Sequence, residues 1–385
     1  MSGPLAGSRI VEMAGAGPGP FAAMLLADLG ADVTRVERTG TRGAGAEQYV
    51  MHRGRRSIAV DLKRSEGVAV VLDLIAGADA LIEGFRPGVM ERLGLGPAEC
   101  SSRNPRLVYG RMTGWGQEGP LARTAGHDIN YIAVSGVLSC IARLGEPPVP
   151  PVNFLGDFAG GGLFLALGIV SAMWEASSSG LGQVIDAAMV DGSAVISTML
   201  HGAMAQGRWR DEAGVNFADG GSNYHNTYTC ADGHHFAVGA IEGPFYADLL
   251  AGLGLNGVDL PDRSKPENWP ELRHRFAEVF MTKTRDEWAS VFASSDACAA
   301  PVLTLTEAPN HPHNMARAVF VERDGIVQPG PAPRFDRIPL ELDRLPPRPG
   351  QNSIEVLNDL GYDHSTIQAL IADGVIGNAG SQDSR

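Results

Sequence analysis

The residues best suited to chemistry in this sequence are one imidazole and one carboxylate, each placed where a loop is expected to become a helix. His127 lies in the run from Gly126 to Tyr131, and Asp157 lies ahead of the glycines at 160 to 162. Two such groups on opposite faces of one carbon atom could move a proton across it. A His beside an Asp is more often structural than catalytic, so the rest of the chain must decide.

The neighbouring residues indicate how each group is held. Apolar residues at 129, 132, 133 and 137 predict a helix that begins just after His127. A helix start carries unpaired N–H groups and partial positive charge, which stabilise an oxyanion and keep a nearby imidazole neutral. We expect Asp157 in the same relation to a helix over 160–176, with glycines that let a ligand approach the backbone. The alternative role for Asp157 is a helix N-cap.

Three further acids could support the imidazole: Asp128, Glu242 and Asp61. Glu242 follows a strand predicted at 236–240, where a loop of a second domain could reach a site on the first. A carboxylate in that position could hold an imidazole in one tautomer.

Strands and helices alternate through the first half of the chain. This pattern favours a parallel sheet that binds ligands at the carboxyl ends of its strands. Strands are predicted at 9–13, 32–37, 57–61, 80–83, 107–111 and from 183, and helices at 20–29 and 65–75, the second opened by a Ser65 cap. The glycines at 15, 17 and 19 predict a strand-to-helix turn, because their spacing and the neighbouring prolines do not fit a dinucleotide fingerprint.

The second half of the chain has a different pattern. A long apolar helix is expected from Asp191 to Gln206, followed by a hairpin, amphipathic helices, a proline-rich arm and two short helices. The predicted hairpin strands cover 226–230 and 235–240, and the predicted helices cover 244–253, 269–281, 284–294, 353–360 and 365–373. We therefore expect an α/β large domain over 1–186, a linker helix region over 187–221, a smaller α+β domain over 222–322, and a C-terminal segment over 323–385 that returns to the large domain.

Basic residues are concentrated in the first third. Arg38, Lys63 and Arg86 each follow a strand, so several cations could gather at one sheet edge and bind a phosphorylated small molecule. The alternative is a solvated surface with local ion pairs. The full set is Arg35, Arg38, Arg42, Arg53, Arg55, Arg56, Lys63, Arg64, Arg86 and Arg92.

Composition narrows the class of protein. The 385 residues are 44% hydrophobic and 19% charged, which fits a globular protein of two domains. The formal net charge of −13 argues against a general binder of nucleic acid or membrane surfaces. The four scattered cysteines predict no metal site, and no secretory signal is visible, so we expect a cytoplasmic protein. The apolar stretch from Leu163 to Trp174 is expected to be too short to span a membrane.

At these residues the chain resembles the class III CoA-transferase family, in particular its α-methylacyl-CoA racemase branch. The resemblance runs along nearly the whole chain. It is carried by the segments 12–15, 31–33, 60–63, 81–88, 92–95, 111–117, 125–131, 156–158, 186–192 and 358–362.

The resemblance implies a Rossmann-like large domain, a smaller domain and an interlocked homodimer. It also implies coenzyme A thioesters as substrates, with coenzyme A entering as part of the substrate and no separate cofactor. The residues that would hold its nucleotide and pantetheine parts are Arg38, Val60, Asp61, Leu62, Lys63, Gly84, Phe85, Arg86 and Arg92. Those that would line the thioester end are Gly126, His127, Asp128, Ile129, Asn130 and Tyr131.

Within the family, His127 favours a racemase over a transferase. The racemases carry the Gly-His-Asp sequence, whereas the transferases use the residue at Asp157 as a nucleophile beneath a glycine loop, and 239–244 lacks a run of glycines. The expected reaction is proton transfer at C2 of a 2-methylacyl-CoA, with His127 and Asp157 as the two bases and Glu242 orienting His127. The N–H of Asp128 would bind the enolate oxygen. A CoA-transferase and a non-enzymatic nucleotide-binding module remain as alternatives.

Overall fold

The structure is a computed structural model that describes residues 2–41 and 49–379. The chain forms two compact units. Unit 1 comprises residues 1–135, 152–196 and 318–385, and unit 2 comprises 136–151 and 197–317. These bounds differ from the predicted ones, because residues 136–151 pack with unit 2 although the sequence placed them in the large domain. The predicted linker is also divided, since its first ten residues belong to unit 1.

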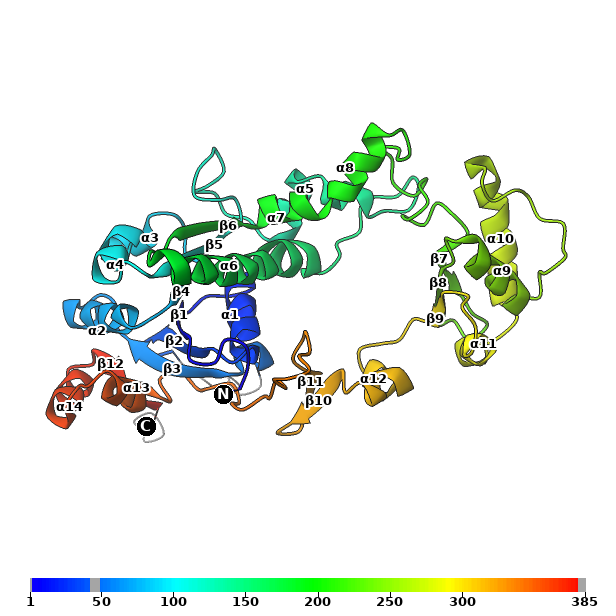
Figure 1. Cartoon of the computed structure of the whole chain (residues 1–385). Helices are drawn as coiled ribbons and strands as arrows, with labels where there is room; N and C mark the ends of the chain where they lie inside the picture. Colours follow the sequence, from blue (N-terminus) through cyan, green and yellow to red (C-terminus); the bar gives the residue numbers. More distant parts are fainter. Residues whose placement is uncertain (1, 42–48, 380–385) are drawn as a thin grey trace. The chain divides into compact units, whose positions relative to one another are not determined.

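The core of unit 1 is a seven-stranded sheet with the order β12-β3-β2-β1-β4-β5-β6 (Figure 1). Six strands run parallel and β12 is antiparallel. This result confirms the predicted parallel sheet. The strand bounds are β1 Arg9–Met13, β2 Asp32–Arg38, β3 Arg55–Val60, β4 Ala80–Glu83, β5 Val108–Thr113, β6 Val184–Ala188 and β12 Ile376–Gly377.

Helices cover both faces of this sheet. One face packs against α1 and α6 through Leu26, Leu165 and Ile169, all less than 2% exposed. The other face packs against α2, α13 and α14. Helix α2 begins at Ser65 without the predicted serine cap, because Arg64 occupies the N-cap position. The bounds are α1 Pro18–Asp28, α2 Ser65–Ala76, α3 Val89–Arg92, α4 Pro97–Arg103, α5 Asp128–Val134, α6 Phe164–Ser179 and α7 Met189–Ile196.

Helix α6 continues a π-helical segment, η4 Phe154–Leu163, so residues 154–179 form one helix of 26 residues. The helix therefore begins before the predicted start near Gly160, and the prediction that its apolar stretch is too short to span a membrane was wrong. By length and composition alone this helix could cross a membrane, although the core helix of a soluble protein meets the same test. One side of α6 packs in the core of unit 1, because Leu165, Ile169, Ala172 and Ala176 are buried.

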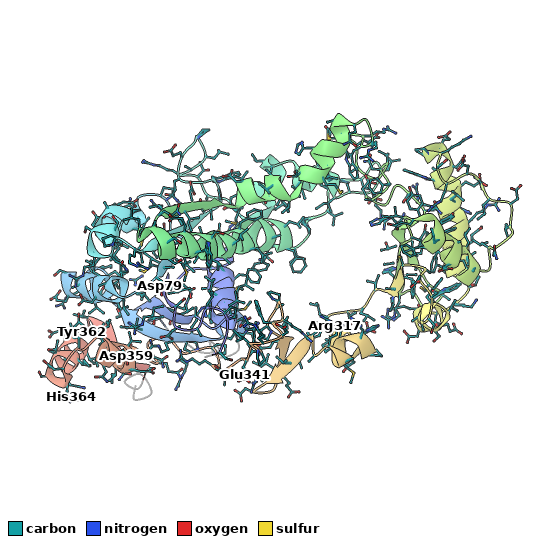
Figure 2. All side chains as sticks on the ribbon, in the orientation of Figure 1. Asp79, Arg317, Glu341, Asp359, Tyr362 and His364 are labelled. Atoms are coloured by element: carbon teal, nitrogen blue, oxygen red, sulfur yellow. The ribbon has the colours of Figure 1, made fainter. Side chains whose placement is uncertain are left out.

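The C-terminal segment of unit 1 reaches back to the sheet. A hairpin of β10 Phe320–Arg323 and β11 Ile326–Pro329, absent from the sequence prediction, precedes the extended proline-rich stretch. Helices α13 Ser353–Asp359 and α14 His364–Ala372 follow, and then β12 pairs with β3. Arg56 pairs with Asp359 and the Tyr362 hydroxyl donates to Asp73, which fixes these helices (Figure 2).

Unit 2 contains a three-stranded antiparallel sheet whose order is β7-β8-β9. The predicted hairpin is present, but β9 was not predicted. The predicted helix over 191–206 is two helices, which meet at Ser197. The bounds are α8 Thr198–Ala205, β7 His225–Thr229, β8 His235–Gly239, α9 Gly243–Gly252, α10 Trp269–Phe280, α11 Arg285–Phe292, β9 Ala299–Pro301 and α12 Pro312–Ala316.

Candidate active site

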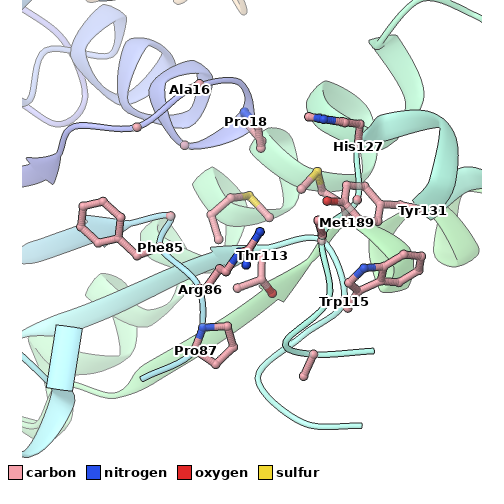
Figure 3. Close-up of a pocket in the computed structure, with 18 of the residues that line it drawn as sticks. Ala16, Pro18, Phe85, Arg86, Pro87, Thr113, Trp115, His127, Tyr131 and Met189 are labelled. Carbon is pink, nitrogen blue, oxygen red and sulfur yellow. The ribbon is translucent and has the colours of Figure 1, made fainter. Parts of the chain in front are cut away.

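A cavity of about 320 Å³ lies at the carboxyl ends of β1, β4 and β5 in unit 1 (Figure 3). The chain leaves β1 and β4 toward opposite sides of the sheet, so this position is the topological switch point where open α/β sheets bind ligands. Six predicted site residues line the cavity: Gly84, Phe85, Arg86, Gly126, His127 and Tyr131.

His127 occupies the N-cap position of α5, as predicted, and its side chain is exposed to the cavity. The Oδ1 atom of Asn130 accepts a hydrogen bond from the His127 N–H at 3.0 Å, so Asn130 shapes this turn rather than lining the cavity. Ile129 is 39% exposed and also lies outside the lining.

Tyr131 explains the glycine that precedes His127. A Cβ atom on Gly126 would lie 2.7 Å from Cε1 of Tyr131, and one on Gly114 would lie 2.1 Å from the same atom. Trp115 meets the Tyr131 ring edge to face, with the ring centroids 4.8 Å apart. Burial raises the pKa of Tyr131, as does the charge of Asp157. The turn that presents His127 is therefore packed tightly around one aromatic ring.

Asp157 is the fourth residue of η4, in its first turn, and Asn153 is the N-cap, so the predicted place ahead of a helix near Gly160 and the N-cap alternative were both wrong. It lies within η4, where Nδ2 of Asn153 donates to its Oδ2 at 3.1 Å. A Cβ atom on Gly17, in the turn between β1 and α1, would lie 3.2 Å from the same oxygen. Asp157 is absent from the residues that line the cavity, but this turn supplies the lining residues Ala16 and Pro18.

The surroundings of Asp157 favour its neutral form. Its pKa is raised above the usual value, chiefly because burial disfavours the charge. Asn153 and His127 oppose this increase, whereas the negative charge of Asp128 adds to it. Asn153 was not predicted from the sequence, although its position one helical turn before Asp157 was a possible signal.

The glycines after Asp157 serve packing and not ligand approach. A Cβ atom on Gly160 would lie 2.6 Å from Oγ of Ser193, one on Gly161 would lie 2.8 Å from Met189, and one on Gly162 would lie 2.7 Å from Phe21. These contacts join η4 to α7 and α1. The expectation that the glycines expose backbone to a ligand was therefore wrong.

Glu242 belongs to unit 2. It precedes α9 as the N-cap residue, its side chain is exposed, and its carboxylate has no hydrogen bond or ion pair with any described residue. A carboxylate in this state is available to a partner.

Seven of the ten basic residues fall into two groups, whereas Arg56 and Arg64 pair with acids and belong to neither. Arg38, Lys63, Arg86 and Arg92 are exposed near the carboxyl ends of β2, β3 and β4, and their side chains have no hydrogen bond or ion pair within the described ranges. We call these four residues the open group. Arg42 lies outside the described residues.

Arg35, Arg53 and Arg55 form the second group, which we call the closed group. Each is at most 5% exposed. Arg55 Nε lies 2.9 Å from Oε2 of Glu12, which also pairs with Arg35. Arg53 Nη2 lies 2.6 Å from Oδ2 of Asp28. These arginines cannot meet a ligand while they are paired, so the predicted cluster contains fewer available cations than the sequence indicated.

The segment 60–63 combines structural and exposed residues. Val60 is 1% exposed and pairs with Ile376 of β12, and Leu62 packs on the core. Oδ1 of Asp61 accepts a hydrogen bond from the Lys63 N–H at 3.1 Å, which shapes the turn after β3. Lys63 is the one residue of this segment whose charged side chain is exposed and has no hydrogen bond or ion pair with a described residue.

Comparison with known proteins gives a consistent result. The model of "CoA-transferase family III" matches residues 5–353. The chain is 48% identical to "Alpha-methylacyl-CoA racemase" of Mus musculus and 46% identical to that of Homo sapiens, each over 374 residues and 97% of both chains. It is also similar to the crystal structure of a CAIB/BAIF family protein from Brucella suis, with a TM-score of 0.81, 26% identity, and coverage of 94% of this chain and 100% of that one.

Proposed function

The chain belongs to CoA-transferase family III, and within that family we propose that it is an isomerase that interconverts the (R) and (S) epimers of 2-methylacyl-CoA thioesters. The observation that carries this proposal is His127 in the lining of the cavity at the switch point of the sheet, with Asp157 packed against the turn at Gly17, whose neighbours Ala16 and Pro18 line the same cavity. The similarity to two racemases over nearly the whole chain supports the same reaction rather than CoA transfer.

The proposed reaction needs one protonated and one unprotonated base. One base removes the proton from C2 and leaves an enolate, and the other base delivers its own proton to the opposite face. The raised pKa of the Asp157 carboxyl lies closer to the usual pKa of an imidazole, so each group can act as acid or base in turn. His127 is the exposed partner and Asp157 the partly buried one.

The enolate oxygen requires a donor. We assign this role to the backbone N–H of Asp128, which has no acceptor among the described residues because it lies in the first turn of α5. Glu242 is assigned to orient His127, a role for which its unpaired carboxylate is suited. The reaction uses side-chain bases and no bound cofactor.

The open group is assigned to the phosphates of coenzyme A. Exposed arginine and lysine side chains at the carboxyl ends of β2, β3 and β4 can pair with a phosphorylated ligand that reaches the cavity. Arg86 lines the cavity itself, and Phe85 beside it offers an apolar surface for pantetheine. The turns at 60–63 and 84–86 would hold the rest of the nucleotide.

We also propose that the protein is a cytoplasmic homodimer that binds neither nucleic acid nor membranes. The outer side of the helix 154–179 supports dimerisation, because large apolar side chains are exposed there. Phe154 is 59% exposed, Leu167 is 63% exposed and Trp174 is 79% exposed. An exposed apolar surface of this kind is suited to another copy of the chain. Measurement of the mass in solution tests this assignment.

The reaction is tested with a single epimer of a 2-methylacyl-CoA in deuterium oxide. We expect deuterium at C2 together with formation of the other epimer. His127→Ala and Asp157→Ala should each lower the rate of inversion by about a hundredfold or more. Absence of exchange by the native protein would sink the racemase proposal, and transfer of coenzyme A to free succinate would favour the transferase. Binding of coenzyme A without any turnover would favour a binding module.

A further inference from the structure

Asp128 connects the two segments that carry the proposed bases. It follows His127 in the sequence, and its side chain is buried, with the residue only 6% exposed. Its Oδ2 atom accepts a hydrogen bond from the backbone N–H of Asp157 at 2.7 Å. The start of α5 and the segment η4 are thus joined by one carboxylate, across 29 positions of sequence.

The contact has no room for a larger residue at position 156. A Cβ atom on Gly156 would lie 2.7 Å from Oδ2 of Asp128 and 3.1 Å from its Cα. Because Gly156 has no positive φ angle, space and not backbone conformation demands glycine here. A side chain at this point would force the two segments apart.

The charge of Asp128 also acts on the carboxyl of Asp157. Its Oδ1 atom is buried and has no hydrogen-bond partner in the described part of the chain, and no cation pairs with it there. The charged or titratable groups that face Asp157 are His127, Asp128 and Tyr131, with the neutral amide of Asn153 on the other side. Asp128 raises the pKa of Asp157, whereas His127 lowers it.

We propose that Asp128 is a positioning residue whose carboxylate locks the Asp157 segment to the helix of His127, so that it is required for inversion more than for proton removal. This inference rests on the proposed racemase function. It goes beyond the role assigned to the Asp128 backbone, because here the side chain of Asp128, and not its N–H group, positions the Asp157 segment.

The consequence follows from the proton balance. His127 removes the C2 proton and an enolate forms. With Asp157 in place, its proton goes to the opposite face and the product is inverted. With Asp157 displaced, the imidazole exchanges its proton with solvent and returns a deuteron to the same face. The first step then yields exchange with retention.

The test compares Asp128→Ala and Asp128→Asn with the native chain. Asp79→Asn is the matched control, since Oδ2 of Asp79 also accepts a backbone N–H, from Arg9 at 2.8 Å, at the amino end of the strands (Figure 2). For each epimer in deuterium oxide, exchange and inversion are measured together. A displacement of about 1 Å can reduce such a rate by about a hundredfold. We expect Asp128→Ala to lose inversion by this factor. Deuterium exchange of the epimer whose proton His127 removes should fall by a factor at least ten times smaller.

Asp128→Asn separates geometry from charge, because the amide oxygen can still accept the Asp157 N–H. We expect a smaller loss of inversion, and an acidic limb of the pH profile that moves to lower pH because the repelling charge is gone. A ¹³C titration of the Asp157 carboxyl, assigned with Asp157→Asn, should show the same direction without any substrate.

The outcomes are distinguishable. Equal losses of exchange and inversion in both Asp128 variants, with an unchanged Asp157 titration, would overturn the positioning role while leaving the racemase intact. A native chain that neither exchanges nor inverts would overturn the proposed function, and the titration would still decide whether Asp128 acts on Asp157. Asp79→Asn should match the native chain in every measurement.

Discussion

The closed group and the open group of basic residues lie in the same unit and differ in burial and in ion pairing. Arg35 and Arg55 of the closed group are buried and share the carboxylate of Glu12. Arg86 and Lys63 of the open group are exposed and unpaired within the described ranges. Both groups consist of basic side chains, so burial and pairing decide which of them build the site and which can meet a ligand.

The closed group shapes the cavity indirectly. Nη2 of Arg35 donates to the carbonyl of Gly15 at 3.3 Å, and Arg55 donates to the carbonyl of Pro20. Gly15 belongs to the turn between β1 and α1 and Pro20 to the first turn of α1, and both residues line the cavity. The buried arginines therefore hold the wall against which the open group would place a substrate.

The largest expected effect comes from breaking the closed group. Arg55→Met leaves Glu12 buried with one partner fewer, so the free energy of unfolding should fall by about 3–5 kcal/mol. Arg56→Met on the same strand is the control, because its partners Asp32, Glu355 and Asp359 are 28%, 52% and 59% exposed and remain hydrated. Urea unfolding measures both. Equal losses would show that burial does not separate the two groups.

His52 offers a pH test of the same region. Burial lowers its pKa to about 3, and the charges of Arg35 and Arg55 add to this effect. The folded state therefore binds fewer protons than the unfolded state below pH 6.5, and stability falls as the pH drops toward 3. Between pH 6 and pH 4 the His52 contribution should be about 1–2 kcal/mol after solvent screening. The free energy of unfolding of His52→Gln, measured against pH, should lack this part of the pH dependence. An unchanged sensitivity to acid would contradict the assignment to His52.

The open group should affect binding and not stability. Arg86→Ala is expected to raise KM for a 2-methylacyl-CoA about tenfold, or about 1.4 kcal/mol, while the melting temperature stays constant. Arg103→Ala is the control, since Arg103 is an exposed arginine that ends α4 before β5 begins. A fall in stability equal to that of Arg55→Met would remove the distinction between the groups.

The smallest effect is the salt dependence. Exposed charges are screened within about 8 Å at physiological ionic strength. Raising the salt should therefore increase KM of the native chain by a few fold and leave that of Arg86→Ala less affected. Unfolding measured in the same buffers should change little through the closed group. The reverse pattern would indicate that the buried pairs, and not the open group, face the ligand.

Sequence reasoning was most successful where a local pattern determines the structure. The parallel sheet and the start of α5 after His127 follow from apolar periodicity and from strands that alternate with helices. Asp157 was misplaced because the glycines at 160–162 were interpreted as a helix start. The helix already begins at Phe154, and these glycines pack against other helices, including Met189 and Phe21.

Pairing between distant residues was beyond local patterns. Arg55 and Arg56 are adjacent in sequence, yet one is fully buried and the other reaches exposed acids of the last helices. The same limit applies to Asn153 and to the Asp128 side chain, whose contacts depend on where separate segments meet.

The late position of β12 in the chain has a consequence for biosynthesis. Unit 1 is assembled from three separated stretches, and β3, which would be an edge strand without β12, receives this antiparallel partner only at residues 376–377. Unit 2 is mostly one continuous stretch and has all its strands once residue 301 has been made. During translation the amino-terminal strands must therefore wait, incompletely covered, while unit 2 can already fold. We therefore expect the nascent large sheet to expose apolar surface and an unpaired strand edge for longer than unit 2 does.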